Sequence, residues 1–374
     1  MKFVVSSIQL LQGLTSVSRV ISNRPPAAIL DNFLFDLKDD RLTVTASDGE
    51  TTLRTDIAID QVLEAGAIAV PAKLLIDSLK EFPDQPLTFE KEGTSMRITW
   101  SSGASAIPCF PQDDYPTMAL PAEESASTIT IPSSTLLNGI NNTIYATAEE
   151  ELRPVMNGIY FDVDTNSTSM VASDAHKLVC YTVKDIVAQG KSSFILHKKP
   201  AAILKSVLAK ADCDVIVKFD SRSAYFVIAN TVLVCRLIDG NYPAYRSVIP
   251  KNNPNKMIVG RVELLNTVRR VAVCSNQSTS HVVLNIHQDE LMISAEDVSF
   301  AVSAYEKLNC QYDGDQIRIS FKAPFLTEIL SNLPYENVVV EMMDSCRAVL
   351  ILSADEKDPN EDLCALLMPI MINA

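Results

Sequence analysis

The segment VASDAHKLVC, residues 171–180, brings together three kinds of side chain that could do chemistry. Asp174 and His176 could act as an acid–base pair, and the thiol of Cys180 could act as a nucleophile beside them. A hydrolase that uses Asp174 and His176 is therefore one hypothesis. The chain contains no G-x-S-x-G elbow, no P-loop, no G-x-G-x-x-G and no H-E-x-x-H, so no second motif supports catalysis.

The Ala-Ser-Asp pattern of this segment recurs along the chain. One copy, LTVTASDGETTLRTD, spans 42–56, and a weaker copy, LMISAEDVSFAVSAY, spans 291–305. Neither copy has a histidine after its aspartate. We therefore interpret the pattern mainly as a turn between two strands, and we expect that the protein is not an enzyme.

Other segments repeat with the same period and predict three domains. Each copy opens with a strand and a helix, continues with short segments rich in β-branched and aromatic residues, and has a second helix with Pro near its start. This pattern predicts an α+β fold in which each domain places two helices on antiparallel sheet. The expected helices are 7–24, 71–82, 133–148, 197–212, 261–276 and 322–334. The expected domains are 1–120, 128–250 and 256–374, with linkers at 116–128 and 249–257.

Composition restricts the possible classes of function. The eight cysteines include no C-x-x-C pair and the four histidines are dispersed, so we expect free thiols in a reducing cytoplasm, no metal site and no cofactor. No run of about 18 apolar residues occurs, which predicts no membrane span. A net charge of −14 argues against nucleic acid as a partner if the charge is evenly spread.

The charge is not evenly spread. The six expected helices contain 12 Lys and Arg against 5 Asp and Glu, whereas the rest of the chain contains 20 against 41. At about 100° per residue, Lys198 and Lys205 project together, away from Leu204, and Arg270 opposes Val268. Helix faces that carry mainly Lys and Arg predict a surface that contacts DNA phosphates, with binding that is non-specific and weakened by salt.

Seven short segments, taken in order, carry a family resemblance. They are MKF at the start, NRP (23–25), VPAK (70–73), RPVMNGIYF (153–161), SDAHKL (173–178), DGNYPAYRSVIP (239–250) and LLMPI (366–370). With these segments the chain resembles, over all 374 residues, the bacterial sliding clamp, which is the β subunit of the DNA polymerase III holoenzyme. The resemblance implies a DNA-clamp fold in which three repeated domains form half of a closed ring. Helices would line the hole, sheets would lie outside, and two chains would close head to tail.

The resemblance also implies a function. A clamp ring encircles duplex DNA and tethers the replicative polymerase, which raises the polymerase's effective concentration at the primer end without catalysis. The implied partners are double-stranded DNA, the polymerase catalytic subunit, the clamp loader and other proteins that carry a clamp-binding peptide. Two alternatives stay open: an interaction scaffold of the same fold that does not thread DNA, and the hydrolase.

Candidate residues follow for three surfaces. The resemblance implies a hydrophobic cleft between the second and third domains that binds partner peptides through Met156, Ser173, Ala175, His176, Lys177, Leu178, Pro243, Val248, Leu366, Met368, Pro369 and Ile370. The resemblance implies Arg24 and Lys73 as DNA contacts, and helical phase and charge add Lys198, Lys199, Lys205, Arg269 and Arg270. The candidates for the dimer interface are Val273 and Cys274, at the end of a helix in the third domain.

Two candidate positions depart from the pattern of the family. Ala175 stands where the family often has Gly or Ser, and Lys177 stands where it usually has Arg. Since Lys lacks the planar fork of Arg, a bidentate contact at position 177 is not expected in this chain.

Overall fold

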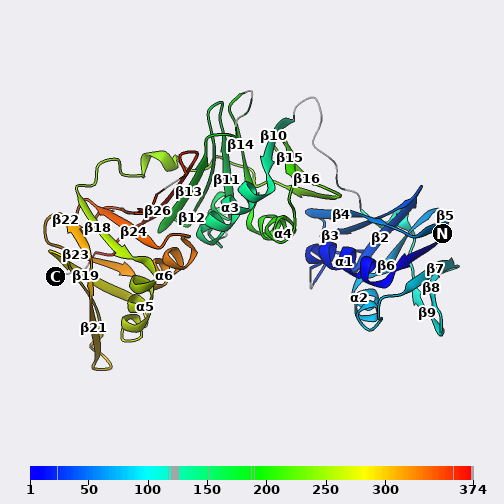
Figure 1. Cartoon of the computed structure of the whole chain (residues 1–374), viewed down its shortest axis with the longest axis horizontal. Coiled ribbons are helices and arrows are strands. Elements are labelled where there is room, and N and C mark those ends of the chain that lie inside the picture. The colour runs from blue at the N-terminus through cyan, green and yellow to red at the C-terminus, as the bar shows by residue number, and fades with distance from the viewer. Residues whose placement is uncertain are drawn as a thin grey trace. The chain divides into compact units, whose positions relative to one another are not determined.

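The structure is a computed structural model, and it describes residues 1–371 except 23, 117, 119–125, 151, 187, 189 and 357. Most of the predicted linker at 116–128 therefore lies outside the described residues. The chain forms two compact units. Unit 1 comprises Met1–Leu137 and Ala202–Leu237, and unit 2 comprises Asn138–Ala201 and Ile238–Ala374. Figure 1 shows the helices and strands of both units.

One order of elements occurs three times along the chain: a strand, a helix, a group of antiparallel strands, a second helix and three final strands. The first copy is β1 (Lys2–Ser6), α1 (Ser7–Val17), β2 (Asn32–Lys38), β3 (Arg41–Ser47), β4 (Thr51–Ala58), β5 (Gln61–Glu64), β6 (Gly66–Pro71), α2 (Ala72–Lys80), β7 (Pro86–Glu92), β8 (Ser95–Trp100) and β9 (Gly103–Pro108). The second is β10 (Ser127–Pro132), α3 (Ser133–Thr143), β11 (Gly158–Val163), β12 (Thr168–Ser173), β13 (Lys177–Val183), β14 (Ser192–His197), α4 (Lys198–Leu208), β15 (Asp214–Phe219), β16 (Ser223–Ile228) and β17 (Thr231–Arg236). The third is β18 (Asn255–Gly260), α5 (Arg261–Ala272), β19 (His281–His287), β20 (Glu290–Asp297), β21 (Val302–Asn309), β22 (Gln311–Asp313), β23 (Ile317–Lys322), α6 (Ala323–Asn332), β24 (Asn337–Met342), β25 (Val349–Ser353) and β26 (Glu361–Leu367). This order confirms the predicted threefold repeat of an α+β unit.

All six predicted helices are present, and each is shorter than its predicted range. At α6 the reason is a proline: Leu333 precedes Pro334 and is extended, with φ −71° and ψ 135°, because the residue before a proline avoids the α region. After α1 the chain tightens into a 3₁₀ turn at Ser18–Val20 and then becomes extended at Ile21. The sequence pattern therefore located the helices correctly but extended their ends too far.

The strands form four antiparallel sheets, and two of these sheets combine strands from neighbouring repeats. In unit 1 the orders are β5-β1-β7-β8-β9 and β10-β15-β16-β17-β4-β3-β2-β6. In unit 2 they are β14-β11-β12-β13-β26-β25-β24-β18-β22 and β21-β20-β19-β23. The joining pairs are β17 with β4 and β13 with β26.

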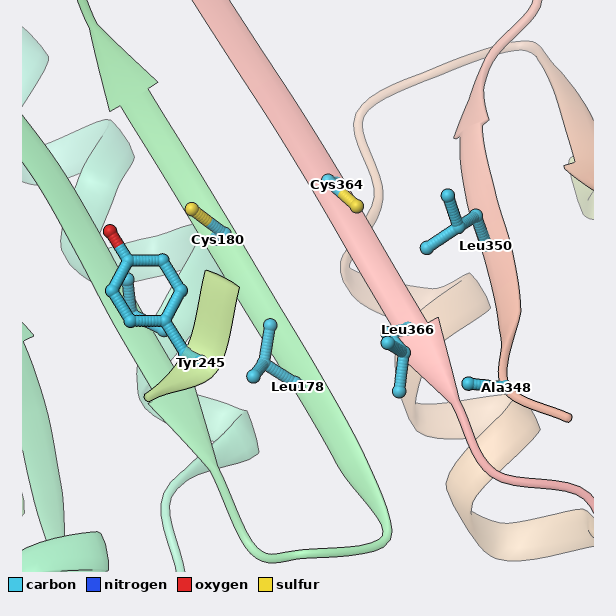
Figure 2. Close-up of a cluster of buried hydrophobic side chains, with 8 residues drawn as sticks. Leu178, Cys180, Tyr245, Ala348, Leu350, Cys364 and Leu366 are labelled. Atoms are coloured by element: carbon cyan, nitrogen blue, oxygen red, sulfur yellow. The ribbon is translucent and has the colours of Figure 1, made fainter. Parts of the chain in front are cut away.

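Apolar faces of the helices and strands make up the cores. Leu10, Leu14 and Val17 of α1 are completely buried, as a helical spacing of three and four residues requires. In unit 2 a buried cluster crosses the β13–β26 pair and includes Leu178, Cys180, Tyr245, Ala348, Leu350, Cys364 and Leu366 (Figure 2). Among the described residues, no helix has the length and apolar character needed to cross a membrane.

Candidate functional site

A largely apolar pocket of about 420 Å³ lies in unit 2. Its walls come from the short 3₁₀ turn before β11, the β12–β13 turn, the segment before β18 and the end of β26. The lining residues are Met156, Ser173, Ala175, His176, Lys177, Leu178, Tyr242, Pro243, Ala244, Tyr245, Ser247, Val248, Leu366 and Met368. A pocket of this size and chemistry accommodates a few apolar side chains of a ligand.

The structure brings together ten of the twelve residues that were predicted to bind partner peptides. The other two, Pro369 and Ile370, do not line the pocket. The Ile370 N–H donates to the Ser320 carbonyl at 2.8 Å, so the chain beyond Met368 turns to follow β23.

The sequence-based assignment missed Tyr242, Ala244, Tyr245 and Ser247. All four lie in the segment DGNYPAYRSVIP, from which only Pro243 and Val248 were selected. Two tyrosines in an otherwise polar, proline-containing segment were the available signal, since aromatic side chains in loops often line binding surfaces.

The β12–β13 turn is built by its own side chains. Asp174 Oδ1 accepts hydrogen bonds from the main-chain N–H groups of His176 and Lys177, both at 2.9 Å, and Ala175 has a positive φ of 73°. In the first repeat, Asp48 accepts from the main chain of Glu50 and Thr51 in the same way. The repeated aspartate is thus a turn-forming residue, as the recurrence predicted.

This geometry leaves no acid–base pair at residues 174 and 176. The second oxygen of Asp174 contacts Lys177 Nζ at 2.6 Å, so the carboxylate is engaged by the turn and by a lysine. Burial raises the pKa of the Cys180 thiol to about 11, which keeps the thiol protonated and weakly nucleophilic at neutral pH. The arrangement therefore gives the hydrolase hypothesis no support.

Lys177 lines the pocket, but its ammonium group is directed elsewhere. The side chain is only 5% exposed, and Nζ lies 2.6 Å from Asp174 Oδ2 and 3.0 Å from Glu328 Oε2 on α6. It also lies 4.8 Å from the centre of the Phe325 ring. Lys177 therefore joins the turn to α6 and does not present a charge to a ligand.

His176 is joined to the same helix. Its ring stacks on Phe325 with the centroids 5.2 Å apart, and its main-chain carbonyl accepts from the Met368 N–H at 2.9 Å. These contacts hold one wall of the pocket between α6 and the chain end.

A buried carboxylate holds a second wall of the pocket. Tyr245 donates its hydroxyl hydrogen to Asp162 Oδ2 at 2.8 Å, and Arg246 pairs with the same oxygen at 2.9 Å. Asp162 is 5% exposed. Tyr242 stacks on Tyr160 with centroids 4.7 Å apart and an interplanar angle of 3°. Both tyrosine rings that face the pocket are thus fixed in place.

The predicted DNA contacts are mostly at the surface. Arg24, Lys73, Lys199, Lys205, Arg269 and Arg270 are exposed, and Lys198 is half-buried. Two of the seven are engaged by carboxylates: Lys198 Nζ lies 2.5 Å from Glu149 Oε1, and Arg270 Nε lies 2.9 Å from Glu306 Oε2. Hydrogen bonding between Arg270 and Glu306 raises the pKa of the arginine and lowers that of the glutamate.

The candidate dimer residues lie just beyond α5. Val273 is 83% exposed, and Cys274 is half-buried. The nearby β20–β21 hairpin, at a sheet edge, also exposes large apolar side chains, notably Phe300 (69%) and Tyr305 (72%). Apolar surface of this kind commonly marks an interface.

Within the part of the chain that the structure describes, no group of three His, Cys, Asp or Glu side chains is arranged to hold a metal ion. The described geometry thus consists of an apolar pocket, exposed basic side chains and an apolar sheet edge.

Three family models match the chain in succession. They are the N-terminal domain of the DNA polymerase III beta subunit over residues 1–119, its central domain over 130–244, and its C-terminal domain over 246–371. The chain belongs to the sliding-clamp family of DNA polymerase III beta subunits. As a sliding clamp, it functions in DNA replication.

Curated sliding clamps of known bacteria match over nearly their whole length. The beta sliding clamp of Haemophilus influenzae is 28% identical over 362 residues, which cover 95% of this chain and 97% of that protein. That of Escherichia coli K12 is 28% identical over 374 residues and is covered completely.

Solved sliding clamps share the fold. A Pseudomonas aeruginosa sliding clamp bound to griselimycin has a TM-score of 0.94 at 24% identity. A Bartonella birtlesii sliding clamp, also bound to griselimycin, has a TM-score of 0.91 at 26% identity. Both comparisons cover 100% of each chain. The clamp fold predicted from the sequence is confirmed.

Proposed function

We propose that two copies of this chain form a ring that encircles duplex DNA and tethers the replicative polymerase through the pocket in unit 2. The observation that carries this proposal is the pocket itself, because side chains from four separate segments converge there and leave about 420 Å³ open. Its occupant is a short linear peptide with a few aliphatic or aromatic anchors. The proposed binding residues are the ten predicted residues that line the pocket, together with Tyr242 and Tyr245.

Support for ring closure comes from a pairing rule within the chain. The last strand of the second repeat, β17, pairs with β4 of the first repeat, and the last strand of the third, β26, pairs with β13 of the second. Strands β4, β13 and β21 occupy the same place in their repeats, directly after the aspartate turn. By this rule β9, the last strand of the first repeat, would pair with β21 of a following repeat.

Both β9 and β21 lie at sheet edges within the chain. A second copy supplies the missing neighbour at each end, so β9 of one protomer pairs with β21 of the other. Two such head-to-tail contacts close a dimer. Val273, Cys274, Phe300 and Tyr305 would then lie at or near this contact.

DNA binding rests on the exposed cations of the helices and the neighbouring loop. Lys73, Lys205 and Arg269 are the clearest candidates, since they are exposed on α2, α4 and α5. Lys198 and Arg270 must exchange a carboxylate for a phosphate, so their contribution is smaller. Such contacts are sequence-independent, as sliding requires.

The remaining assignments complete the proposal. The partners are double-stranded DNA, the polymerase catalytic subunit, the clamp loader and other proteins with clamp-binding peptides. The protein works in the cytoplasm, without catalysis and without a cofactor. Its domains are 1–120, 128–250 and 256–374.

A polymerase-binding assay tests the pocket. The double variant His176→Ala, Met368→Ala removes one pocket-lining side chain from each of two segments. It is expected to weaken binding of the polymerase catalytic subunit by at least about tenfold, since each lost apolar contact is worth about 1 kcal/mol or more. Leu63→Ala, at an exposed position in unit 1, is the matched control and leaves affinity unchanged. Unaltered affinity of the double variant, measured by surface plasmon resonance, would show that the polymerase binds elsewhere.

A further inference from the structure

Another pocket, of about 680 Å³, lies in unit 1 where the first two repeats meet. Helix α1 and the end of α4 line it (Figure 1), and Arg19 Nη1 donates to Ser206 Oγ at 3.0 Å between them. Strand β4 and the β16–β17 turn also line this pocket, which we call the α1–α4 groove. It shares no lining residue with the pocket in unit 2, and none of the seven predicted DNA contacts lines it.

The side of α1 that lines the groove carries hydrogen-bond donors. Gln9, Gln12 and Ser16 follow one another at the spacing of one helix face, and Arg19 continues this row in the 3₁₀ turn after α1. Helix α1 contains no Asp or Glu. At 1.5 Å per residue the row is about 15 Å long. Amide, hydroxyl and guanidinium groups are donors that proteins use to bind DNA phosphates.

The charged side chains of the groove are three cations and two carboxylates. Asp40 lies 3.6 Å from Arg41, and Asp56 accepts a hydrogen bond at 2.7 Å from the threonine opposite it on β3. Arg19 and Lys210 are exposed, and within the described residues neither forms an ion pair with a carboxylate. The groove therefore keeps a net positive charge in a chain whose overall charge is −14, which suits an anionic ligand.

The matching groove in unit 2 has the opposite charge. It is lined by α3, the end of α6, β13 and the start of β26, which hold the same places in their repeats as α1, α4, β4 and β17. Its described lining includes Glu356, Asp358 and Glu361 and contains no Lys or Arg. The fold alone thus does not make such a groove basic. The positive charge belongs to the residues that this chain has at one of its two joins between repeats.

We propose that the α1–α4 groove binds phosphates of the DNA backbone, with Arg19 and Lys210 as the charged contacts and the polar row of α1 as the uncharged donors. This inference rests on the proposed function as a ring around duplex DNA and adds a binding site that the predicted contacts do not include. Unit 1 therefore provides more of the phosphate contact than unit 2, whose matching groove repels the backbone. Contacts of this kind do not depend on base sequence, as sliding requires.

The salt dependence of DNA binding tests this site, because each phosphate contact contributes about 0.9 to the slope of log Kd against log salt concentration. The probe is a short fluorescein-labelled duplex, and fluorescence anisotropy measures its Kd for the full-length protein over a salt series. The double variant Arg19→Gln, Lys210→Gln should lower the slope by about 2 and raise the Kd at least about tenfold at low salt. Lys210→Gln alone, at an exposed position, should lower the slope by about 1.

Lys91→Gln, Lys218→Gln is the matched control. It removes the same charge from strands β7 and β15 of unit 1, outside the groove, and its slope should equal that of the wild type. Equal losses in the two double variants would mean that overall charge, and not the groove, governs binding, and the inference would be wrong. It would also be wrong if the groove variants kept the wild-type slope, or if the wild type did not bind the duplex at low salt.

Retention on closed circular DNA separates this inference from the proposed function. A ring with weakened phosphate contacts still has no path off a closed circle, so the groove variant should be retained as the wild type is. If the wild type is retained and the salt slopes are equal, only the phosphate site is wrong. If the wild type is released while the groove variant has the lower slope, the ring is wrong and the phosphate site stands.

Discussion

At the scale of single residues, the β12–β13 turn contains an alanine in a backbone conformation that favours glycine. The family often has Gly or Ser where this chain has Ala175, and the structure gives Ala175 a φ of 73°. In the first repeat, Gly49 has a φ of 94° at the matching position. A side chain is strained in this region and a glycine is not.

Ala175→Gly is therefore expected to stabilise the protein by about 1 kcal/mol, after the greater entropy of glycine in the unfolded chain is included. Ala172→Gly is the control, because Ala172 is buried in β12, outside the left-handed region, and should lose about 1 kcal/mol. Urea denaturation measures both. A destabilised Ala175→Gly variant would mean that the turn does not strain its alanine.

Lys177 gives a second prediction at this scale. Its removal by Lys177→Met leaves Asp174, whose side chain is 14% exposed, beside an apolar group, so we expect a loss of about 3 kcal/mol. Glu328 is 40% exposed, and Glu328→Gln should cost about 1 kcal/mol or less.

A double variant tests whether Lys177 and Glu328 stabilise the protein through their contact with each other. Because Lys177 and Glu328 contact each other, their losses should not add, and the Lys177→Met, Glu328→Gln protein should be more stable than the sum of the two losses implies. Strict additivity in urea denaturation would argue that the ion pair between Lys177 and Glu328 contributes nothing.

At the scale of elements, the sequence was sufficient for the parts that depend on local pattern. Helical spacing and proline positions located all six helices, and the recurrence of Ala-Ser-Asp identified the turns. The merging of repeats into shared sheets was not predictable, since the β17–β4 pair joins residues far apart in the chain, such as Thr231 and Thr55. No local pattern records such a pairing.

For the candidate sites too, local pattern predicted some features, and features that depend on distant segments were not predictable. Helical phase correctly placed Lys205 and Arg269 at the surface. It could not predict that Glu149 pairs with Lys198 or that Glu306 pairs with Arg270, because each carboxylate comes from a segment that is distant in sequence. The pocket residues came from the family resemblance. The resemblance also assigned Ile370 to the pocket, whereas in the structure its main-chain N–H donates to the Ser320 carbonyl.

At this scale, the testable prediction concerns the edge strand β21 and its proposed role in dimer formation. Phe300→Asp places a charge on the proposed contact between protomers, where it has no partner and resists burial. The wild type should have a solution mass of about twice 41.0 kDa and the variant a larger monomer fraction, with dimer dissociation favoured at least about tenfold. Sedimentation equilibrium measures both.

Leu63→Asp is the matched control for this experiment. Leu63 is 48% exposed on β5, the opposite edge of the sheet that contains β9, and the pairing rule leaves that edge outside the dimer. Its variant should stay dimeric. If Phe300→Asp stays dimeric as well, the protomers meet through another surface.

At the scale of the whole molecule, the three repeats, the pocket and the basic helix faces combine into one account. The chain has an overall charge of −14, so simple electrostatic attraction does not explain a stable association with DNA. The proposed ring explains it by topology: a closed ring stays on DNA because it has no free path off, while the contacts with phosphate stay weak enough for sliding.

The most direct measurement is retention on DNA of defined topology. The protein is placed on nicked circular DNA by a clamp loader, the nick is sealed, and the complexes pass through a gel-filtration column at high salt, where phosphate contacts are screened. The account predicts that the protein remains with the closed circles and is released when a restriction enzyme linearises them. Release from closed circles, or equal retention on circular and linear DNA, would contradict it.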